Sequence, residues 1–229
     1  MSPLVARLPE IVMQLMAFAL ALSLHEAAHG FVAERLGDPT ARWLGRITLN
    51  PIKHIDPFGT ILFPLLLAAV GAPVLGWAKP VPFVTRNLRN QRWGPALVGL
   101  AGPASNIALG IAVTLVLLLA KAVMPGFRPL LVVLVHEGAM GAAGLAAPLV
   151  YLLFALAMIN LVLAVFNLIP IPPLDGSHIV EAALPARAAF TYARLRPYGM
   201  FILLAFFWSG LFGHVLKPFL YGLLWILQR

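Results

Sequence analysis

Four long stretches of the sequence carry almost no charged residues, and they restrict the possible folds more than any other feature. These stretches are residues 11–32, 95–120, 138–174 and 197–228. A helix needs about 20 apolar residues to cross a bilayer, and each stretch is long enough. Only 10% of the residues are charged and the mean hydropathy is +0.93, whereas roughly a quarter of the residues are charged in a soluble domain. The sequence therefore excludes a soluble globular enzyme and a disordered chain.

The same pattern predicts an all-α polytopic membrane protein that forms one domain over residues 1–229. About four to six transmembrane helices fit the apolar content. The core motifs fall within residues 10–180, and residues 198–228 add one or two C-terminal spans. A further apolar stretch, 61–78, is interrupted by Pro64, Gly71 and Pro73, so its placement needs a separate argument.

Basic residues supply that argument. They form three groups, which are Arg35, Arg42, Arg46 and Lys53; Lys79, Arg86, Arg89 and Arg92; and Arg187, Arg194 and Arg196. If 61–78 crossed the bilayer, the first two groups would lie on opposite sides. A re-entrant hairpin near residues 61–78 puts all eleven on one side, which the positive-inside rule makes cytoplasmic. The sequence therefore favours the hairpin.

The remaining composition excludes other classes of protein. The chain has no cysteine, so disulfides, thiol nucleophiles and thiolate ligands are ruled out. The net charge of +8 comes from scattered residues that form no binding face for nucleic acid. In a membrane protein this excess of basic residues is read as a topology signal.

The first apolar stretch contains His25-Glu26-Ala27-Ala28-His29, an HExxH motif. Residues four apart share one face of a helix, so both imidazoles can reach one metal ion. Glu26 lies beside that site, where its carboxylate can take a proton from an attacking water. The alternative is a pair of structural histidines, but three ionisable residues within one turn are costly at membrane depth. The motif therefore predicts a catalytic metal site.

A catalytic zinc takes three protein ligands and keeps one position open, so a third ligand must come from another segment. The other acidic residues are Glu10, Glu34, Asp38, Asp56, Glu137, Asp175 and Glu181. Topology favours Asp175, because the span ending near Pro170 runs in the same direction as the HExxH span and ends at a similar depth. Pro172 and Pro173 then break the helix, and such backbone can line a cavity. The alternative role of Asp175 is a turn or helix cap before Gly176.

Five sequence elements together resemble the site-2 protease family of intramembrane zinc metalloproteases. They are HEAAH at 25–29, NPIKH at 50–54, GWAKPVP at 76–82, GPASN at 102–106 and NLIPIPPLDG at 167–176. The resemblance implies one zinc ion per chain, held by His25, His29 and Asp175, with Glu26 as the general base. It also implies that Asn167 helps to hold the substrate or the oxyanion.

The resemblance further implies a zinc-dependent intramembrane metalloendopeptidase that cleaves transmembrane or membrane-adjacent substrates. The expected partners are a membrane protein or peptide substrate and the lipid bilayer, with no nucleic acid. Members often carry an extra span or a PDZ or CBS domain, and this chain is expected to belong to the short, minimal branch. The expected location is the plasma (inner) membrane of a prokaryote, with the active site near the cytoplasmic face. The hairpin and residues 79–82 are expected to pair with an extended substrate peptide.

Two other functions fit the same residues. A metal transporter would use the ligands for transit, but its polar residues would continue across the bilayer. Here they gather near one face. A non-catalytic membrane scaffold would retain the fold and the ligands, and the intact Glu26 speaks against that alternative.

Several other residues have more than one interpretation. His54 either orients the substrate or the metal ligands, or it is a solvated loop residue. His178 either supports Asp175 or lies on the surface. Asn106 needs a hydrogen-bond partner in an apolar helix, and helix packing is favoured over a substrate contact. Gly99 and Gly102 are small residues at close-packing spacing and predict a helix interface.

Overall fold

The computed structural model describes residues 8–62, 66, 79–137 and 146–229. The longer helices are α2 (Leu8–Arg35), α5 (Gly94–Val123), α6 (Phe127–Glu137), α7 (Ala147–Asn167), α10 (Gly199–Trp208) and α11 (Leu211–Gln228). The shorter ones are α3 (Thr40–Trp43), η1 (Pro51–His54), η2 (Pro57–Leu62), η3 (Thr85–Asn87), α8 (Gly176–Ala183), α9 (Ala186–Ala193) and η5 (Arg196–Tyr198). No strand occurs in the described ranges. The predicted all-α fold is confirmed.

Four helices, α2, α5, α7 and α11, are long and apolar enough to cross a membrane. Each falls within or overlaps one of the four predicted stretches, and the chain is an integral membrane protein. The stretch 197–228 holds two helices, because Gly210 adopts a left-handed φ of 73° that ends α10 and begins α11. The 10 residues of α10 cover only about 15 Å. Of these two helices, α11 alone is long enough to span.

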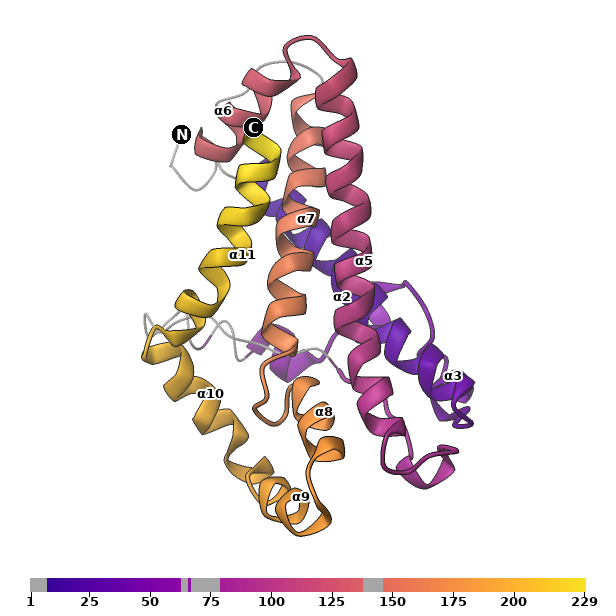
Figure 1. Cartoon of the computed structure of the whole chain (residues 1–229). Helices are drawn as coiled ribbons and strands as arrows, with labels where there is room; N and C mark the ends of the chain where they lie inside the picture. The colour runs from indigo at the N-terminus through magenta and orange to yellow at the C-terminus, as the bar shows by residue number, and fades with distance from the viewer. Residues whose placement is uncertain (1–7, 63–65, 67–78, 138–145) are drawn as a thin grey trace.

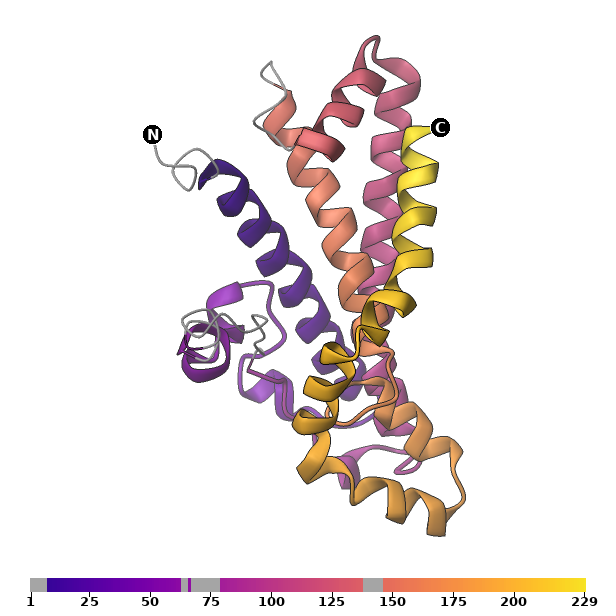
Figure 2. The same ribbon diagram turned by 90° about the vertical axis from the view of Figure 1, so that its left-hand side faces the viewer.

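Helices α2, α5 and α7 pack against one another, and α11 lies beside α7 (Figure 1). α5 runs in the opposite direction to α2 and α7. Small buried residues, such as Ala17 and Ala21 of α2 and Ala155 and Ala157 of α7, line the main core. Such residues let helices approach closely in a bilayer, where apolar burial alone gives little drive for association. Figure 2 shows α2 leaning away from α7 at its N-terminal end and approaching it at the other end.

The two ends of the bundle differ in what they carry. α6 and both termini lie at one end, and α3, α8 and α9 lie at the other (Figure 1). The connections between α2 and α5 and between α7 and α10 carry ten of the eleven basic residues named above, and Arg35 is the last residue of α2. These connections lie toward the end with α3, α8 and α9. The basic residues are therefore grouped toward one end, as the hairpin prediction requires.

The turn of the predicted hairpin, residues 71–73, lies outside the described residues, but both flanks of the 61–78 segment are described. The backbone N–H of Lys79 donates to the His54 carbonyl at 2.9 Å. The Arg46 guanidinium also donates to the Lys79 carbonyl. A single crossing would separate the flanks by about the 30 Å thickness of the hydrocarbon core. The flanks therefore adjoin as the hairpin requires, and its turn stays a prediction.

Asp38 fixes the segment that follows the hairpin against the end of α2. Its buried carboxylate accepts hydrogen bonds from Thr40 Oγ1 at 2.5 Å, Val84 N at 2.6 Å and Asn87 Nδ2 at 3.0 Å. Burial opposes ionisation, but these hydrogen bonds outweigh it and lower the pKa of Asp38. Asp38 is therefore a structural carboxylate in this fold.

Candidate metal centre

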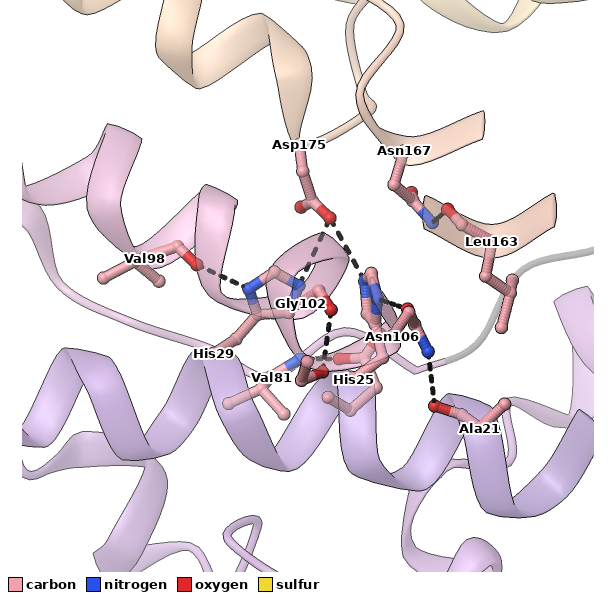
Figure 3. Close-up of polar contacts among 12 residues, drawn as sticks. Ala21, His25, His29, Val81, Val98, Gly102, Asn106, Leu163, Asn167 and Asp175 are labelled. Carbon is pink, nitrogen blue, oxygen red and sulfur yellow. Dashed lines mark hydrogen bonds and ion pairs between the residues drawn. The ribbon is translucent and has the colours of Figure 1, made fainter. Parts of the chain in front are cut away.

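α2 brings His25 and His29 onto one face, as the four-residue spacing predicts. Both side chains are buried, and their ring centroids lie 4.6 Å apart in an edge-to-face arrangement. The helix continues through the motif without a break, because Ala27 and Ala28 between the histidines are small, strong helix formers. The two rings therefore approach one another beside α5 (Figure 3).

Asp175 reaches the same point from the turn after α7. Its Oδ2 lies 3.1 Å from His25 Nε2 and 3.3 Å from His29 Nε2. Two ligands at about 2.0–2.2 Å on a tetrahedral zinc lie about 3.3–3.6 Å apart, so a shift of a few tenths of an ångström lets these atoms share one ion. Among the described residues, these three form the group of side chains able to hold a metal. The structure thus brings together the three residues expected as ligands.

The tautomer of His29 follows from its partner. Nδ1 of His29 lies 2.7 Å from the carbonyl oxygen of Val98 in α5. A carbonyl can only accept, so Nδ1 carries the proton. In the neutral ring the lone pair is then on Nε2, which faces Asp175.

The tautomer of His25 follows from a chain of two amides. Nδ1 of His25 lies 2.6 Å from Asn106 Oδ1. The Asn106 amide nitrogen donates to the Ala21 carbonyl at 3.2 Å and to Asn160 Oδ1 at 2.7 Å, so its oxygen must face His25. Asn160 is oriented in turn by donating to the Leu156 carbonyl at 2.8 Å. Nδ1 of His25 is therefore protonated, and its Nε2 also presents a lone pair.

Gly102 of α5 leaves the space that a metal ion would need. A Cβ at this position would lie 2.5 Å from His29 Nε2 and 2.6 Å from His25 Nε2. Real Cβ contacts are not that close, so an alanine would occupy the point where the two nitrogens converge. The sequence predicted a helix interface for Gly102, and that prediction was incomplete because the missing Cβ also leaves room beside the imidazoles. Gly99 is a close-packing position, where a Cβ would lie 3.0 Å from the Asp175 carbonyl.

The donor set fits a zinc ion. In their neutral forms, two imidazole nitrogens and one carboxylate direct lone pairs at the same point, and Asp175 Oδ2 is buried with no hydrogen-bond donor. Such an arrangement is repulsive unless a cation lies between the groups. Nitrogen and oxygen ligands in this number are those of catalytic zinc sites, and the outer partners Val98 and Asn106 orient the rings as such sites require.

Glu26 lies next to this centre and is itself held in place. Its side chain is buried, and Oε2 accepts a hydrogen bond from the backbone N–H of Val81 at 2.9 Å. Val81 belongs to the Lys79-Pro80-Val81-Pro82 segment, which sequence analysis expected to pair with a substrate strand. The N–H of Lys79 binds His54, that of Val81 binds Glu26, and the two prolines have none. Residues 79–82 therefore keep no N–H for a substrate in this structure, and pairing of this segment with a substrate stays a prediction.

In the described part of the chain, the side chains of Asn167, His54 and His178 form no hydrogen bond to the three expected ligands. Asn167 is the last residue of α7, and its amide nitrogen donates to the Leu163 carbonyl of its own helix at 3.0 Å (Figure 3). His54 is buried, with Nε2 2.9 Å from the Thr48 carbonyl. It is therefore a packed loop residue and is not solvated. His178 donates its backbone N–H to the Asp175 carbonyl at 3.0 Å, and burial lowers the pKa of its ring.

Sequence reasoning missed two features of the centre. Asn106 was assigned to packing, whereas it contacts His25 directly, and Asn160 was not considered. The signal for Asn106 was present, since a lone amide in an apolar membrane helix requires a polar partner. The sequence did not indicate that this partner would be a metal-site histidine 81 residues away.

Comparison with known proteins gives a consistent result. The model of the family described as Peptidase family M50 matches residues 13–210. Putative zinc metalloprotease YwhC of Bacillus subtilis is 38% identical over 202 residues, which cover 88% of this chain and 82% of the relative. Putative zinc metalloprotease Rip2 of Mycobacterium tuberculosis H37Rv is 32% identical, over 86% of this chain and 66% of the relative. Rip2 of Mycolicibacterium smegmatis is 29% identical, over 80% of this chain and 61% of the relative. No solved structure matches.

Proposed function

This chain belongs to peptidase family M50, the site-2 protease family, and from that premise we propose that it is a zinc-dependent intramembrane metalloendopeptidase. The family and its relatives support a membrane zinc metalloprotease. The finer proposal is that the substrates are transmembrane or membrane-adjacent peptide segments. The observation that carries it is the convergence of three ligand atoms next to Glu26, inside a bundle of membrane-spanning helices.

Each residue has a proposed part in the chemistry. His25, His29 and Asp175 would hold one zinc ion, which supplies Lewis acidity toward the scissile carbonyl and the attacking water. Glu26 takes the proton from that water and returns it to the leaving amine. The Val81 N–H occupies one carboxylate oxygen of Glu26 and leaves the other for this transfer. Asn167 would donate to the oxyanion after its amide turns away from Leu163.

We place the active site on the cytoplasmic side of the membrane. His25 and His29 lie in the C-terminal half of α2, toward the end of the bundle that carries the basic connections. The positive-inside rule assigns that end to the cytoplasm. The relatives come from bacteria, which supports a prokaryotic inner membrane.

A metal transporter and a scaffold are the competing functions. A transporter needs successive sites along a path, and in the described part of the chain one group of ligating side chains is found. The amide chain that continues from His25 ends at the backbone carbonyls of Ala21 and Leu156 and leads to no second site. A scaffold would have no need of a carboxylate held beside the ligands.

The deciding experiment compares the purified wild-type chain with Glu26→Gln. We expect one zinc per chain in both, with cleavage of a helical membrane reporter reduced about 10²–10⁴-fold in the variant, because an amide cannot accept the proton. Activity within a few-fold of wild type would refute the proposed base. Zinc flux into vesicles without cleavage would identify a transporter, and bound zinc with neither activity would identify a scaffold.

A further inference from the structure

Arg46 is a buried cation whose contacts are with backbone carbonyls. Its side chain is 6% exposed. Nη1 donates to the Lys53 carbonyl at 2.5 Å, and Nη2 donates to the carbonyls of Lys79 and Pro80, the latter at 3.2 Å. No carboxylate among the described residues is recorded as an ion-pair partner. Burying a guanidinium without a carboxylate partner is costly. The burial of Arg46 against these carbonyls therefore suggests that it holds them in place for a purpose.

The reason lies at the other side of the same peptide unit. The Pro80 carbonyl and the Val81 N–H belong to one planar peptide group. Arg46 binds the oxygen of this group, and Glu26 Oε2 accepts from its N–H at 2.9 Å. A buried cation and a buried carboxylate therefore share a single peptide, which in its trans form points its oxygen and its N–H in opposite directions.

The flanking prolines make this peptide irreplaceable for Glu26. Pro80 and Pro82 have no N–H, so Val81 offers the one donor in the tripeptide. A positive charge at the carbonyl polarises the peptide and strengthens its N–H as a donor, because hydrogen bonds in a chain reinforce one another in a low-dielectric interior. The orientation of the Glu26 carboxylate thus depends on this peptide, and the place of the peptide depends on Arg46.

We propose that Arg46 is a positioning residue for Glu26 and acts through the Pro80–Val81 peptide. The proposal rests on the proposed function, in which Glu26 is the general base. It predicts an effect on the chemical step, while the ligands His25 and His29, which have their own partners in α5, keep their affinity for zinc.

The test uses purified full-length protein with a membrane reporter, and it measures kcat, KM, zinc content and thermal unfolding. Arg46→Gln should lower kcat about 10–100-fold, the range expected for a lost hydrogen bond to a charged group. KM and zinc content should stay within about two-fold, and Arg46→Lys should recover part of kcat. Arg42→Gln, which removes a surface arginine paired with Glu34, is the matched control and should behave as wild type.

A second pair of variants tests the peptide itself. Val81→Pro removes the N–H, whereas Val81→Ala retains it, so the loss of kcat should be much larger for proline. Pro82 already confines residue 81 to the extended region, which limits the strain of the proline variant. Combining Arg46→Gln with Val81→Pro should add less than about two-fold, because both act on one contact. If Arg46→Gln does not fold, Arg46→Lys takes its place, because lysine keeps the positive charge and loses the forked guanidinium. A kcat of Arg46→Lys equal to that of wild type would then overturn the role of Arg46.

The outcomes separate this proposal from the proposed function. Three outcomes would overturn the role of Arg46. The first is a double variant whose loss of kcat is the full product of the two single losses. The others are equal losses for Val81→Pro and Val81→Ala, and an Arg46→Gln effect confined to KM or zinc content. An inactive Glu26→Gln together with a normal Arg46→Gln would overturn this inference alone. An active Glu26→Gln would refute the proposed function first.

Discussion

The amide oxygen of Asn106 lies 2.6 Å from Nδ1 of His25, across the contact between α5 and α2. The oxygen cannot turn away, because the amide nitrogen is engaged by the Ala21 carbonyl and by Asn160. Asn106 therefore sets which nitrogen of His25 is available to a metal, and it does so from a neighbouring helix. The metal centre thus extends beyond its three expected ligands.

Asn106→Ala should lower zinc affinity by about 10–100-fold, the usual cost of removing a partner that orients a ligating histidine. Without the acceptor, the ring of His25 is free to rotate or to change tautomer. Competition between the purified protein and a chromophoric chelator measures the affinity directly. Asn167→Ala is the control, because among the described residues the Asn167 side chain bonds only to the Leu163 carbonyl of its own helix. Equal losses in both variants would contradict the role given to Asn106.

Gly102→Ala should abolish zinc binding while the bundle still folds. The added methyl would lie 2.5–2.6 Å from both Nε2 atoms, in the space between the imidazoles. Metal analysis after purification reads out the loss. Gly110→Ala on the same helix is the matched control, since its Cβ would make an ordinary contact of 3.5 Å with Asn160. A Gly102→Ala protein with one zinc per chain would show that the metal binds elsewhere.

The sequence predicted the local part of this centre well. His25 and His29 are related by helical periodicity, and the sequence alone defines that relation. Asp175 could be predicted because the directions of the spans constrain depth. The contacts of Asn106, Gly102 and Arg46 could not be predicted, since each depends on which faces of different segments meet. Periodicity describes one helix at a time and gives no information on its rotation against a neighbour.

Asn167 shows a different limit. The family resemblance assigned it a part in holding the substrate or the oxyanion, and the structure makes it the last residue of α7, before the turn that carries Asp175. Its amide is nevertheless bonded to Leu163 within α7. A role in holding the substrate or the oxyanion therefore requires this amide to turn away from Leu163, and that role stays a prediction.

Asp38→Asn should destabilise the protein by about 1–3 kcal/mol at neutral pH, because an amide cannot accept all the hydrogen bonds that the buried carboxylate receives. The pKa of Asp38 is lowered in the fold. The ionised carboxylate of Asp38 therefore contributes its full stabilisation at a pH above about 4, the pKa of an aspartate in the unfolded chain. This stabilisation is lost as the pH falls through the lower pKa that Asp38 has in the folded protein. Unfolding in detergent between neutral and acidic pH measures both effects.

The control for Asp38 is Glu181→Gln, which removes a surface ion pair with Arg196 and should cost no more than about 1 kcal/mol. The difference in stability between wild type and Asp38→Asn should shrink as the pH falls below about 4. A difference that stays constant over this range would mean that Asp38 is not ionised in the fold.

The last prediction concerns the membrane orientation. Single cysteines in place of Lys53, Arg89 and Arg187 should react with a membrane-impermeant reagent only after the cells are opened, and one in place of Arg128 should react in intact cells. All four side chains are exposed, and the native chain has no cysteine to interfere. The prediction follows from two independent observations. The first three positions belong to the connections that carry the basic residues, and the flanks of the 61–78 segment adjoin at His54 and Lys79.

A kinked crossing by residues 61–78 would place Lys53 and Arg89 in different compartments. It would also reverse α5 and α7 relative to α2, so that Asp175 would end at the face opposite His25. That outcome conflicts with the 3.1 Å between Asp175 Oδ2 and His25 Nε2, since about 30 Å of hydrocarbon core would separate the two faces. Labelling of Lys53 and Arg89 from different sides would therefore contradict the orientation of the helices and the metal centre together.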